Sequence, residues 1–325
     1  MIISKTPLRI SFFSGGSDMP AFYEKQKGAA LSVTIDKYIY VMLHHTSHLG
    51  VKTMYDSIEE YPDVDTMQHA ITRETLKHYN VEKEITIASI SDILAKGSGL
   101  GSSSAFTVGL TNCLNTYGNH FSSRECLAQN AYFIERKKCG YPVGKQDQYA
   151  AVYGGMNLFE FNTDNSVDVK VLADAGNWLS FENRLLLVYS GVGRSANGIL
   201  QKQAAAMSDK DKLELVKRSR DKAYVAARYL KQRQHDDFGS LLHDAWMDKK
   251  AVAGDISNDY FDEIYSKALG AGALGGKLLG AGGGGFFIFY VNPEKKEQVS
   301  KAITTGSNCK IYDFKFTEQG STIIA

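Results

Sequence analysis

The sequence has 325 residues, of which 43% are hydrophobic, and its 37 basic and 36 acidic side chains leave a net charge of +1. A chain of this length can bury a large core and suggests roughly two domains. Because no strong overall charge would attract nucleic acid or an anionic membrane, the composition favours a small molecule as the partner.

The N-terminal stretch and the cysteines bear on the cellular compartment. MIISKTPLRISFF is interrupted by charged residues and a proline, so it fits a strand better than a signal peptide. No run approaches the roughly 18 apolar residues of a membrane span. The four cysteines include no CxxC pair, and we expect buried, reduced thiols rather than a disulfide scaffold: Cys113, Cys126, Cys139 and Cys309. We therefore expect a cytoplasmic protein.

Strand-like runs rich in β-branched and aromatic residues occur along the whole chain. In order, they are RISFF (9–13), KYIYVMLHH (37–45), EITIASI (84–90), RLLLVYSG (184–191), FFIFYV (286–291) and KIYDFKF (310–316). Helical patterns lie between them without regular alternation, which favours an α+β fold over a doubly wound sheet. A change to polar composition at FNTDNSVD (161–168) marks a connection.

Several helices can be placed by periodicity and capping residues. Apolar residues at three- and four-residue steps share one helix face after residue 105: Phe106, Leu110, Cys113, Leu114 and Tyr117. Ser122 and Glu125 form a capping-box pattern for a helix that ends near Gly140. A long charged helix is expected over 209–233 and another over about 259–269.

The stretch KGSGLGSSSAF (96–106) combines alternate glycines with three serines before a helix. Glycines let backbone N–H groups approach a ligand, and a helix N-terminus carries unpaired, partly positive N–H groups. Serine hydroxyls can bind phosphate oxygen or a hard cation such as Mg²⁺. The stretch thus suits a nucleotide phosphate, with a plain glycine turn and serine cap as the alternative. It matches neither a Walker loop nor GxGxxG.

Three stretches together resemble the signatures of the GHMP small-molecule kinases. GSGLGSSSA (97–105) is similar to the second signature, PLRISFFSGGSD (7–18) to the first and KLLGAGGGGFFIFY (277–290) to the third. The resemblance implies a two-domain α+β architecture, with domains 1–180 and 181–325 and the active site in the cleft between them. Many members have a proline just before the loop, where this chain has Ala95 and Lys96.

The resemblance also implies ATP and Mg²⁺ as cofactors and assigns roles to individual residues. Ser103 and Glu135 fall on magnesium ligands, Asp147 on the catalytic aspartate, and Arg9 on the basic residue beside the acceptor hydroxyl. The residues expected to bind ATP are Lys96, Gly97, Ser98, Gly99, Leu100, Gly101, Ser102, Ser103 and Ser104.

Each of these roles has an ordinary structural alternative. Glu135 precedes three basic residues and could belong to a solvated helix end. Asp147 could be a helix N-cap, alone or in addition to catalysis. Arg9 could simply face solvent from a strand.

Acceptor recognition is expected near the first and third signatures. Asp18 can accept hydrogen bonds from sugar hydroxyls, or cap a turn, and the neighbouring Gly15, Gly16 and Ser17 are assigned with it. Gly283 and Gly284 belong to a run, 282–285, that could approach the substrate or the ATP loop, or pack tightly against a strand.

Longer segments resemble the D-glycero-D-manno-heptose 7-phosphate kinase family: 187–200, 241–265 and 270–290. The resemblance implies phosphorylation of the anomeric hydroxyl of that sugar phosphate to the 1,7-bisphosphate. A second anion site would then be needed, and Arg194 with Ser195 suits it. Weaker candidates, equally explained as surface residues, are Arg73, Lys145 and Lys277.

Other functions remain open at this stage. The chain could act on fucose, mannose or galactose, or bind a nucleotide or sugar without turnover. The oligomeric state is undetermined by the sequence.

Overall fold

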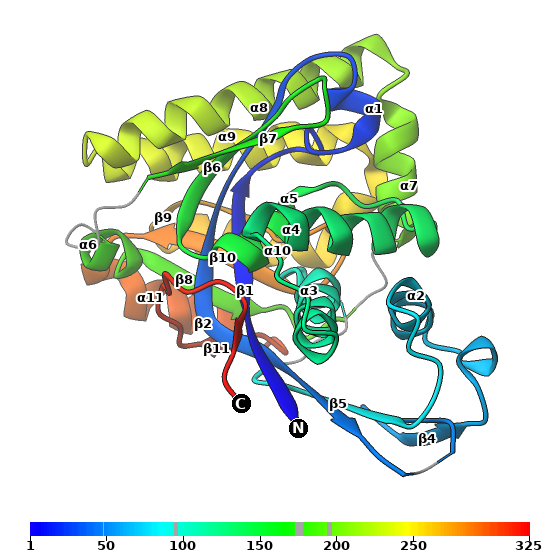
Figure 1. Cartoon of the computed structure of the whole chain (residues 1–325). Helices are drawn as coiled ribbons and strands as arrows, with labels where there is room; N and C mark the ends of the chain where they lie inside the picture. Colours follow the sequence, from blue (N-terminus) through cyan, green and yellow to red (C-terminus); the bar gives the residue numbers. More distant parts are fainter. Residues whose placement is uncertain (48, 94–96, 173–177, 194–196) are drawn as a thin grey trace.

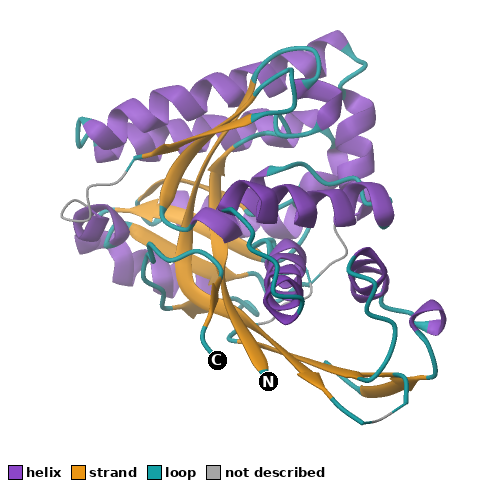
Figure 2. Ribbon diagram, viewed as in Figure 1, coloured by secondary structure: helices purple, strands orange, loops and turns teal. Residues whose placement is uncertain are grey.

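The computed structural model describes residues 1–47, 49–93, 97–172, 178–193 and 197–325. It contains an eight-stranded and a four-stranded sheet, with helices packed on both (Figures 1 and 2). The α+β fold is therefore confirmed. Within the described residues, no helix combines the length and apolar character that crossing a bilayer requires.

The eight-stranded sheet is built around the two longest strands, β1 (Ile2–Phe13) and β2 (Gly28–His45), which pair antiparallel. Its order is β12-β1-β2-β5-β3-β4, and β6 and β7 extend it from β2. The first part of β2 pairs with β6 and the last part with β5. The other strands are β3 (Val51–Met54), β4 (Ile58–Tyr61), β5 (Ile85–Ser91), β6 (Met156–Phe161), β7 (Val167–Val171) and β12 (Thr322–Ile323).

The pairing of β1 with β2 has two irregularities close to the first signature, the first with extra residues on β2 and the second with an extra residue on β1. Its register against β2 shifts between Pro7 and Leu8 and again between Ser11 and Phe13. Proline cannot donate to a ladder, and β-bulges re-aim side chains and increase local twist. Arg9 therefore lies on a short regular piece of β1 between two bulges.

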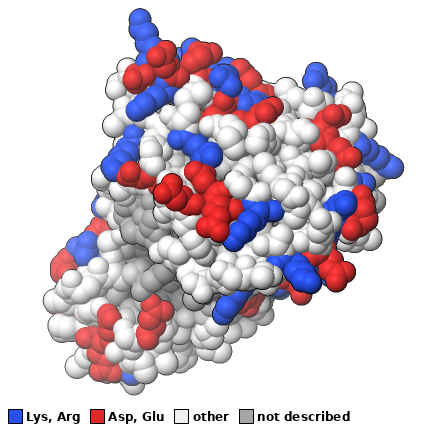
Figure 3. Space-filling view, turned by 180° about the vertical axis from the view of Figure 1, so that it is seen from behind, with Lys and Arg blue, Asp and Glu red and all other residues white. Residues whose placement is uncertain are grey.

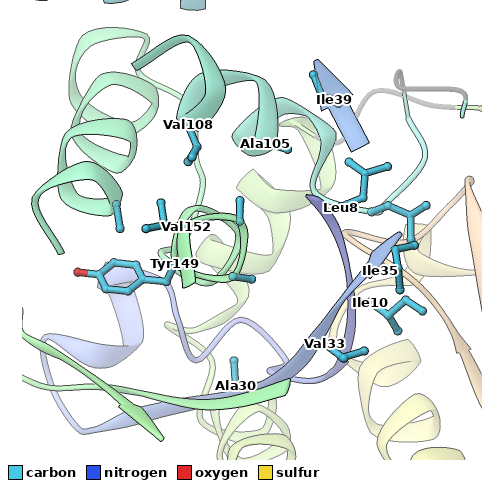
Figure 4. Packing of buried hydrophobic residues seen from close by; sticks show 14 of the residues in the cluster. Leu8, Ile10, Ala30, Val33, Ile35, Ile39, Ala105, Val108, Tyr149 and Val152 are labelled. Atoms are coloured by element: carbon cyan, nitrogen blue, oxygen red, sulfur yellow. The ribbon is translucent and has the colours of Figure 1, made fainter. Parts of the chain in front are cut away.

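Helices α3 (Ser102–Tyr117) and α5 (Gln146–Tyr153) pack on the strands of this sheet. Three further elements pack against these helices: α2 (Ala70–His78), α4 (Arg124–Phe133) and the π-helical segment η2 (Ile134–Lys138). Figure 4 shows how the sheet and helices α3 and α5 share one core, to which they contribute Leu8, Ile10, Val33, Ile35, Ala105, Val108, Tyr149 and Val152. All eight of these side chains are buried, so hydrophobic burial fixes both helices against β1 and β2.

The four-stranded sheet has the order β11-β8-β10-β9. Its strands are β8 (Leu185–Tyr189), β9 (Ala273–Leu278), β10 (Phe286–Val291) and β11 (Lys310–Tyr312). Two long helices, α8 (Lys210–Lys231) and α9 (His235–Val252), lie side by side (Figure 1). Helix α8 contacts β1, β2 and β6, and α9 contacts β9 and β10 as well as β1, so this helix pair joins the two sheets.

The remaining helices are shorter or lie at the edges. They are α1 (Pro20–Tyr23), α6 (Trp178–Glu182), α7 (Asn197–Ala206), α10 (Asp259–Gly270) and α11 (Lys296–Thr304), with 3-10 turns η1 (Val64–Thr66), η4 (Gly254–Ile256) and η5 (Pro293–Lys295). The division at residue 180 stays a prediction: strands before and after it belong to different sheets, but β12 returns to β1.

Two local expectations are wrong, the Ser122 cap and the burial of all four cysteines. Ser123, not Ser122, caps α4, because its side chain accepts from the Cys126 amide. The polar stretch 161–168 is a connection, as expected, and contains the turn of the β6–β7 hairpin. All four cysteines are free, as expected, but Cys126 is exposed and Cys139 is only partly buried.

Candidate active site

The glycine-rich loop enters α3 in a conformation that requires glycine. Gly97, Gly99 and Gly101 have φ of 69°, 76° and 78°, in the left-handed region. The first helical hydrogen bond runs from the Ala105 amide to the Gly101 carbonyl. The amides of residues 102–104 are therefore the N-terminal donors that a helix leaves without intrahelical partners, and such amides suit a phosphate.

The third signature packs directly against this loop. The Phe286 amide donates to the Ser98 carbonyl at 3.0 Å. A Cβ on Gly285 would lie 2.3 Å from that same carbonyl oxygen, and a Cβ on Gly99 would lie 2.6 Å from the Leu279 carbonyl oxygen. These approaches exclude any side chain, so Gly285 brings the third signature against the glycine loop, whereas a Cβ on Gly282 would meet Ile256. A role of glycines 282–285 in binding substrate or ATP stays a prediction.

Arg9 connects the glycine loop to the predicted catalytic aspartate. Its Nε and Nη2 donate to the two carboxylate oxygens of Asp147 at 2.9 and 2.7 Å, and its Nη1 donates to the Gly99 carbonyl at 2.7 Å. Arg9 is 4% exposed, so the alternative of a solvent-facing arginine is wrong. The forked pairing fixes both side chains in one plane beside the loop.

Asp147 lies in the first turn of α5, where a negative charge is favoured by the helix dipole. Lys145, not Asp147, occupies the N-cap position, so the capping alternative is wrong. The carboxylate side chain keeps 31% of its surface exposed while its partner Arg9 is buried. Asp147 can therefore be reached from outside the protein.

Glu135 lies in the π-helical segment η2 and is fully buried. Its carboxylate accepts hydrogen bonds from Thr107 Oγ1 at 2.6 Å, Ser104 Oγ at 3.0 Å and Gln148 Nε2 at 3.0 Å. Burial raises the pKa of Glu135 to about 7, against the opposing effect of these donors. The solvated helix-end alternative is thus wrong. π-helical turns of this kind are frequent at functional sites.

The donor set around Glu135 fits Mg²⁺. Carboxylate and hydroxyl oxygens are the ligands this hard cation prefers, and it is typically held by one or two carboxylates plus substrate phosphates. Within the described ranges, no cluster of three His, Cys, Asp or Glu side chains could hold a metal on its own. A single carboxylate beside a loop whose free amides suit a phosphate agrees with that shared mode of binding.

The adjacent Ser103 and Ser104 differ in their surroundings. Ser103, the predicted metal ligand, is exposed, whereas Ser104 is buried and bonded to Glu135. Ser98 and Ser102 bond to each other through their hydroxyls at 2.7 Å, and Leu100 is fully buried. Any metal contact of Ser103 stays a prediction.

Asp18 lies in the turn after β1 and contacts the start of α5. It accepts from Ser14 Oγ at 2.9 Å and from the Gln146 amide at 3.3 Å, so it caps α5 from a distant part of the chain. Burial, and then the charge of Asp147, raise the pKa of Asp18. A Cβ on Gly144 would lie 2.0 Å from its carboxylate, which makes glycine necessary there.

Its neighbours have mainly packing roles. Ser17 is fully buried and its hydroxyl both donates to the Ala29 carbonyl and accepts from the Ala29 amide, so its assignment to substrate is corrected to a link between β1 and β2. Gly15 and Gly16 have φ of 64° and 90°. A Cβ on Gly15 would lie 2.5 Å from the Ser219 side chain on α8.

The other assigned residues are three that fall outside the described ranges and two glycines of the third signature. Lys96, Arg194 and Ser195 lie outside the described residues. Gly283 donates to the Ile256 carbonyl at 2.8 Å and Gly284 is buried.

The weaker candidates for a phosphate contact are engaged within the protein. Arg73 donates to the Met67 carbonyl and to Glu74. Lys145, whose Nζ donates to the Asn165 carbonyl, and Lys277 are each 5% exposed, so neither is a surface lysine.

Sequence reasoning missed the polar residues that support the site: Ser11, Ser14, Thr107 and Gln146. Thr107 lies three residues after Ser104 on the same face of α3, a spacing that could have revealed it. Ser11 donates to Gln146 at 3.1 Å across 135 residues of sequence, and no local pattern signals such a contact.

Comparison with known proteins agrees with this geometry. Residues 66–155 match the family model for the GHMP kinases N terminal domain, and residues 226–307 match that for the GHMP kinases C terminal region. A protein from Campylobacter jejuni subsp. jejuni serotype O:2, named D-glycero-alpha-D-manno-heptose 7-phosphate kinase, is 31% identical over 98% of this chain and 97% of its own length. The chain belongs to the GHMP kinase family.

Two further similar proteins are also named as sugar kinases. The crystal structure of a D-glycero-D-manno-heptose 1-phosphate kinase from Bacteroides thetaiotaomicron superposes with a TM-score of 0.80 at 25% identity, covering 100% of this chain and 99% of that one. The bifunctional fucokinase/GDP-fucose pyrophosphorylase of Arabidopsis thaliana is 25% identical over 89% of this chain but only 30% of its own length. This GHMP kinase is therefore an ATP-dependent sugar kinase.

Proposed function

We propose that this GHMP kinase transfers the γ-phosphoryl group of ATP to the anomeric hydroxyl of D-glycero-D-manno-heptose 7-phosphate, giving the 1,7-bisphosphate. The observation that carries the proposal is the Arg9–Asp147 pair held against the glycine loop, in a chain that aligns along nearly its whole length with a kinase of that name. Phosphoryl transfer depends mainly on positioning and charge stabilisation, which this arrangement supplies.

In this mechanism, the amides at the start of α3 bind the ATP phosphates. Asp147 orients the acceptor hydroxyl and accepts its proton while the oxygen forms a bond to the γ-phosphorus and the bond to the ADP oxygen breaks. Arg9 stabilises the negative charge that develops on the acceptor oxygen. Glu135 and Ser103 would hold Mg²⁺, which neutralises phosphate charge when bound.

Asp18 would bind hydroxyls of the sugar near the reacting centre. Its carboxylate is held by Ser14 and by the Gln146 amide, one residue before Asp147. A sugar hydroxyl bonded to Asp18 would therefore lie close to the catalytic carboxylate, which supports recognition of a polyol.

The names of the two heptose kinases place the phosphate of the acceptor at different carbons. The test is release of ADP from Mg-ATP with heptose 7-phosphate, heptose 1-phosphate, the free heptose, mannose, fucose, galactose and mevalonate. We expect preference for the 7-phosphate, and ³¹P NMR of the product should show a new anomeric phosphate ester. Preference for the 1-phosphate or a free sugar would overturn the substrate assignment but not the kinase.

A second candidate is phosphorylation of fucose or a related free hexose. Similarity to the fucokinase over 89% of this chain favours it, and the same panel tests it. Binding without turnover is the remaining alternative, and the Arg9–Asp147 pair speaks against it because a binding protein needs no proton acceptor.

A further inference from the structure

Lys277 is the first residue of the third signature and lies in β9, opposite Ile288 of β10. It is 5% exposed, and its Nζ donates to the Phe12 carbonyl of β1 at 2.9 Å. The contact therefore joins the small sheet to the large one at the strand that carries Arg9.

Phe12 lies at the second irregularity in the pairing of β1 with β2, where the extra residue is on β1. In the register against β2, Ser11 faces Ser32 and Phe13 faces Leu31, so Phe12 has no partner residue. A bulge leaves its extra residue outside the ladder, and a buried carbonyl there needs another donor. Lys277 is that donor, and a charged donor makes a stronger hydrogen bond than a neutral one.

The bulge separates two parts of the site. Arg9 lies three residues before Phe12, and the turn that ends at Asp18 begins two residues after it. A change of conformation at the bulge would alter the direction of both, and misplacement by about 1 Å can cost on the order of 100-fold in rate.

We propose that Lys277 is a positioning residue for phosphoryl transfer, which holds the bulge of β1 through the Phe12 carbonyl and so sets the placement of Arg9 relative to the acceptor turn. Only the expected effects of Lys277 variants on kcat and KM rest on the proposed kinase function. The structural consequence applies to the protein without any substrate.

The charges around Lys277 explain why it suits this role. Arg9 faces it from β1, and Asp147 on α5 is bonded to Arg9. Lys249 on α9 donates to the carbonyls of Leu278 and Gly280 next to it. Burial, and then the charge of Arg9, lower the pKa of Lys277 to about 7. The ammonium is thus costly to bury, but it makes a stronger hydrogen bond to the Phe12 carbonyl than the neutral amine would.

The experiment compares Lys277→Met, Lys277→Arg and a control, Lys222→Met. Lys222 is also largely buried and pairs with Asp248, but it lies between α8 and α9, away from the glycine loop. The first readout is hydrogen–deuterium exchange of peptides covering residues 8–18 in the ligand-free protein. We expect faster exchange in Lys277→Met, recovery in Lys277→Arg, and no change there in Lys222→Met.

The second readout is kinetics with whichever acceptor the wild-type enzyme phosphorylates. We expect kcat to fall about 10- to 100-fold in Lys277→Met while KM for ATP changes less than about threefold, with partial recovery in Lys277→Arg. The wild-type kcat/KM for the acceptor should decrease as the pH rises through about 7 and Lys277 loses its proton, and Lys277→Arg should lack this decrease because arginine stays protonated.

Unchanged exchange over residues 8–18 in Lys277→Met would overturn the proposal, and so would equal kinetic losses in Lys277→Met and Lys222→Met. Failure of every sugar as an acceptor would instead contradict the proposed function. The hydrogen–deuterium exchange of residues 8–18 would still test whether Lys277 holds the bulge of β1.

Discussion

Arg9 and Asp147 form the pair on which the proposed chemistry depends most directly. Asp147→Asn removes the proton acceptor but keeps the size of the side chain and one acceptor for Arg9. We expect kcat to fall by about 100-fold or more while ATP affinity changes little, because the glycine loop is untouched. Steady-state kinetics and nucleotide titration measure the two effects. Asp164→Asn, in the exposed β6–β7 turn, is the control, and near-normal turnover of Asp147→Asn would remove Asp147 from the mechanism.

Ser103 and Ser104 are adjacent in sequence but should respond differently to alanine. Ser104 donates to a buried carboxylate, so Ser104→Ala should lower the free energy of unfolding by about 1–3 kcal/mol. Ser103 is exposed, and Ser103→Ala should leave stability unchanged but raise the Mg²⁺ concentration needed for half-maximal activity. Chemical denaturation and Mg²⁺ titration measure these effects. The reverse pattern would transfer the metal contact to Ser104.

At the scale of elements, the loop of the third signature packs so closely on the glycine loop that we expect the two loops to move together. Gly285 has φ of 91°, and a Cβ there would lie 2.3 Å from the Ser98 carbonyl oxygen. Gly285→Ala should therefore displace the glycine loop, raise KM for ATP at least about tenfold and destabilise the protein. Gly270→Ala at the end of α10, where a Cβ meets nothing within 4 Å, is the control. Equal KM values in both variants would show that the loops move independently.

Regular elements could be predicted from sequence where burial imposes a strong local pattern. The charged helix expected over 209–233 is α8 (Lys210–Lys231), and FFIFYV is β10 (Phe286–Val291). Helix α9 was not anticipated, because its polar first turn and scattered apolar residues give a weak pattern. Short strands such as β4, whose residues are mostly exposed, depend on pairing with a neighbour, which a single segment does not reveal.

The residues of the candidate site also fall into those that a sequence pattern reveals and those that it does not. The glycine loop, Arg9, Glu135 and Asp147 could be recognised because their motifs are contiguous, and the structure brings them together. Contacts across long separations could not: Asp18 caps α5 although 128 residues separate it from Gln146. Nor does local sequence reveal that β1 contains a bulge at Phe12, since bulges arise from pairing between strands.

At the scale of the whole molecule, charge is balanced locally as well as in total. Figure 3 shows acidic and basic side chains intermingled on the face seen from behind, which agrees with a net charge of +1 and with a small-molecule partner. Glu135 and Lys277 differ from these surface charges, because both are buried in the protein and each has a pKa of about 7.

These two buried groups should make stability depend on pH in opposite directions. The pKa of Glu135 rises from 4.5 to about 7 on folding, so the native state binds more protons between these values and unfolding becomes easier as the pH rises. At about 1.4 kcal/mol per unit, the loss approaches about 3 kcal/mol. Lys277, with its pKa lowered from 10.5, binds fewer protons when folded, so its contribution rises above about pH 7.

Urea unfolding in metal-free buffer between pH 5 and 9 measures this dependence. Wild-type stability should pass through a minimum near pH 7, where Glu135 has lost its proton in the folded protein and Lys277 begins to lose its own. Glu135→Gln, which keeps the shape without the charge, should flatten the acid side of the curve, and Lys277→Met the alkaline side. Adding Mg²⁺ should raise the stability of the wild-type protein at pH 7 more than that of Glu135→Gln, since binding to the folded state stabilises it. An acid side that is equally steep in Glu135→Gln would mean that other carboxylates, Asp18 first among them, control the stability of the whole molecule.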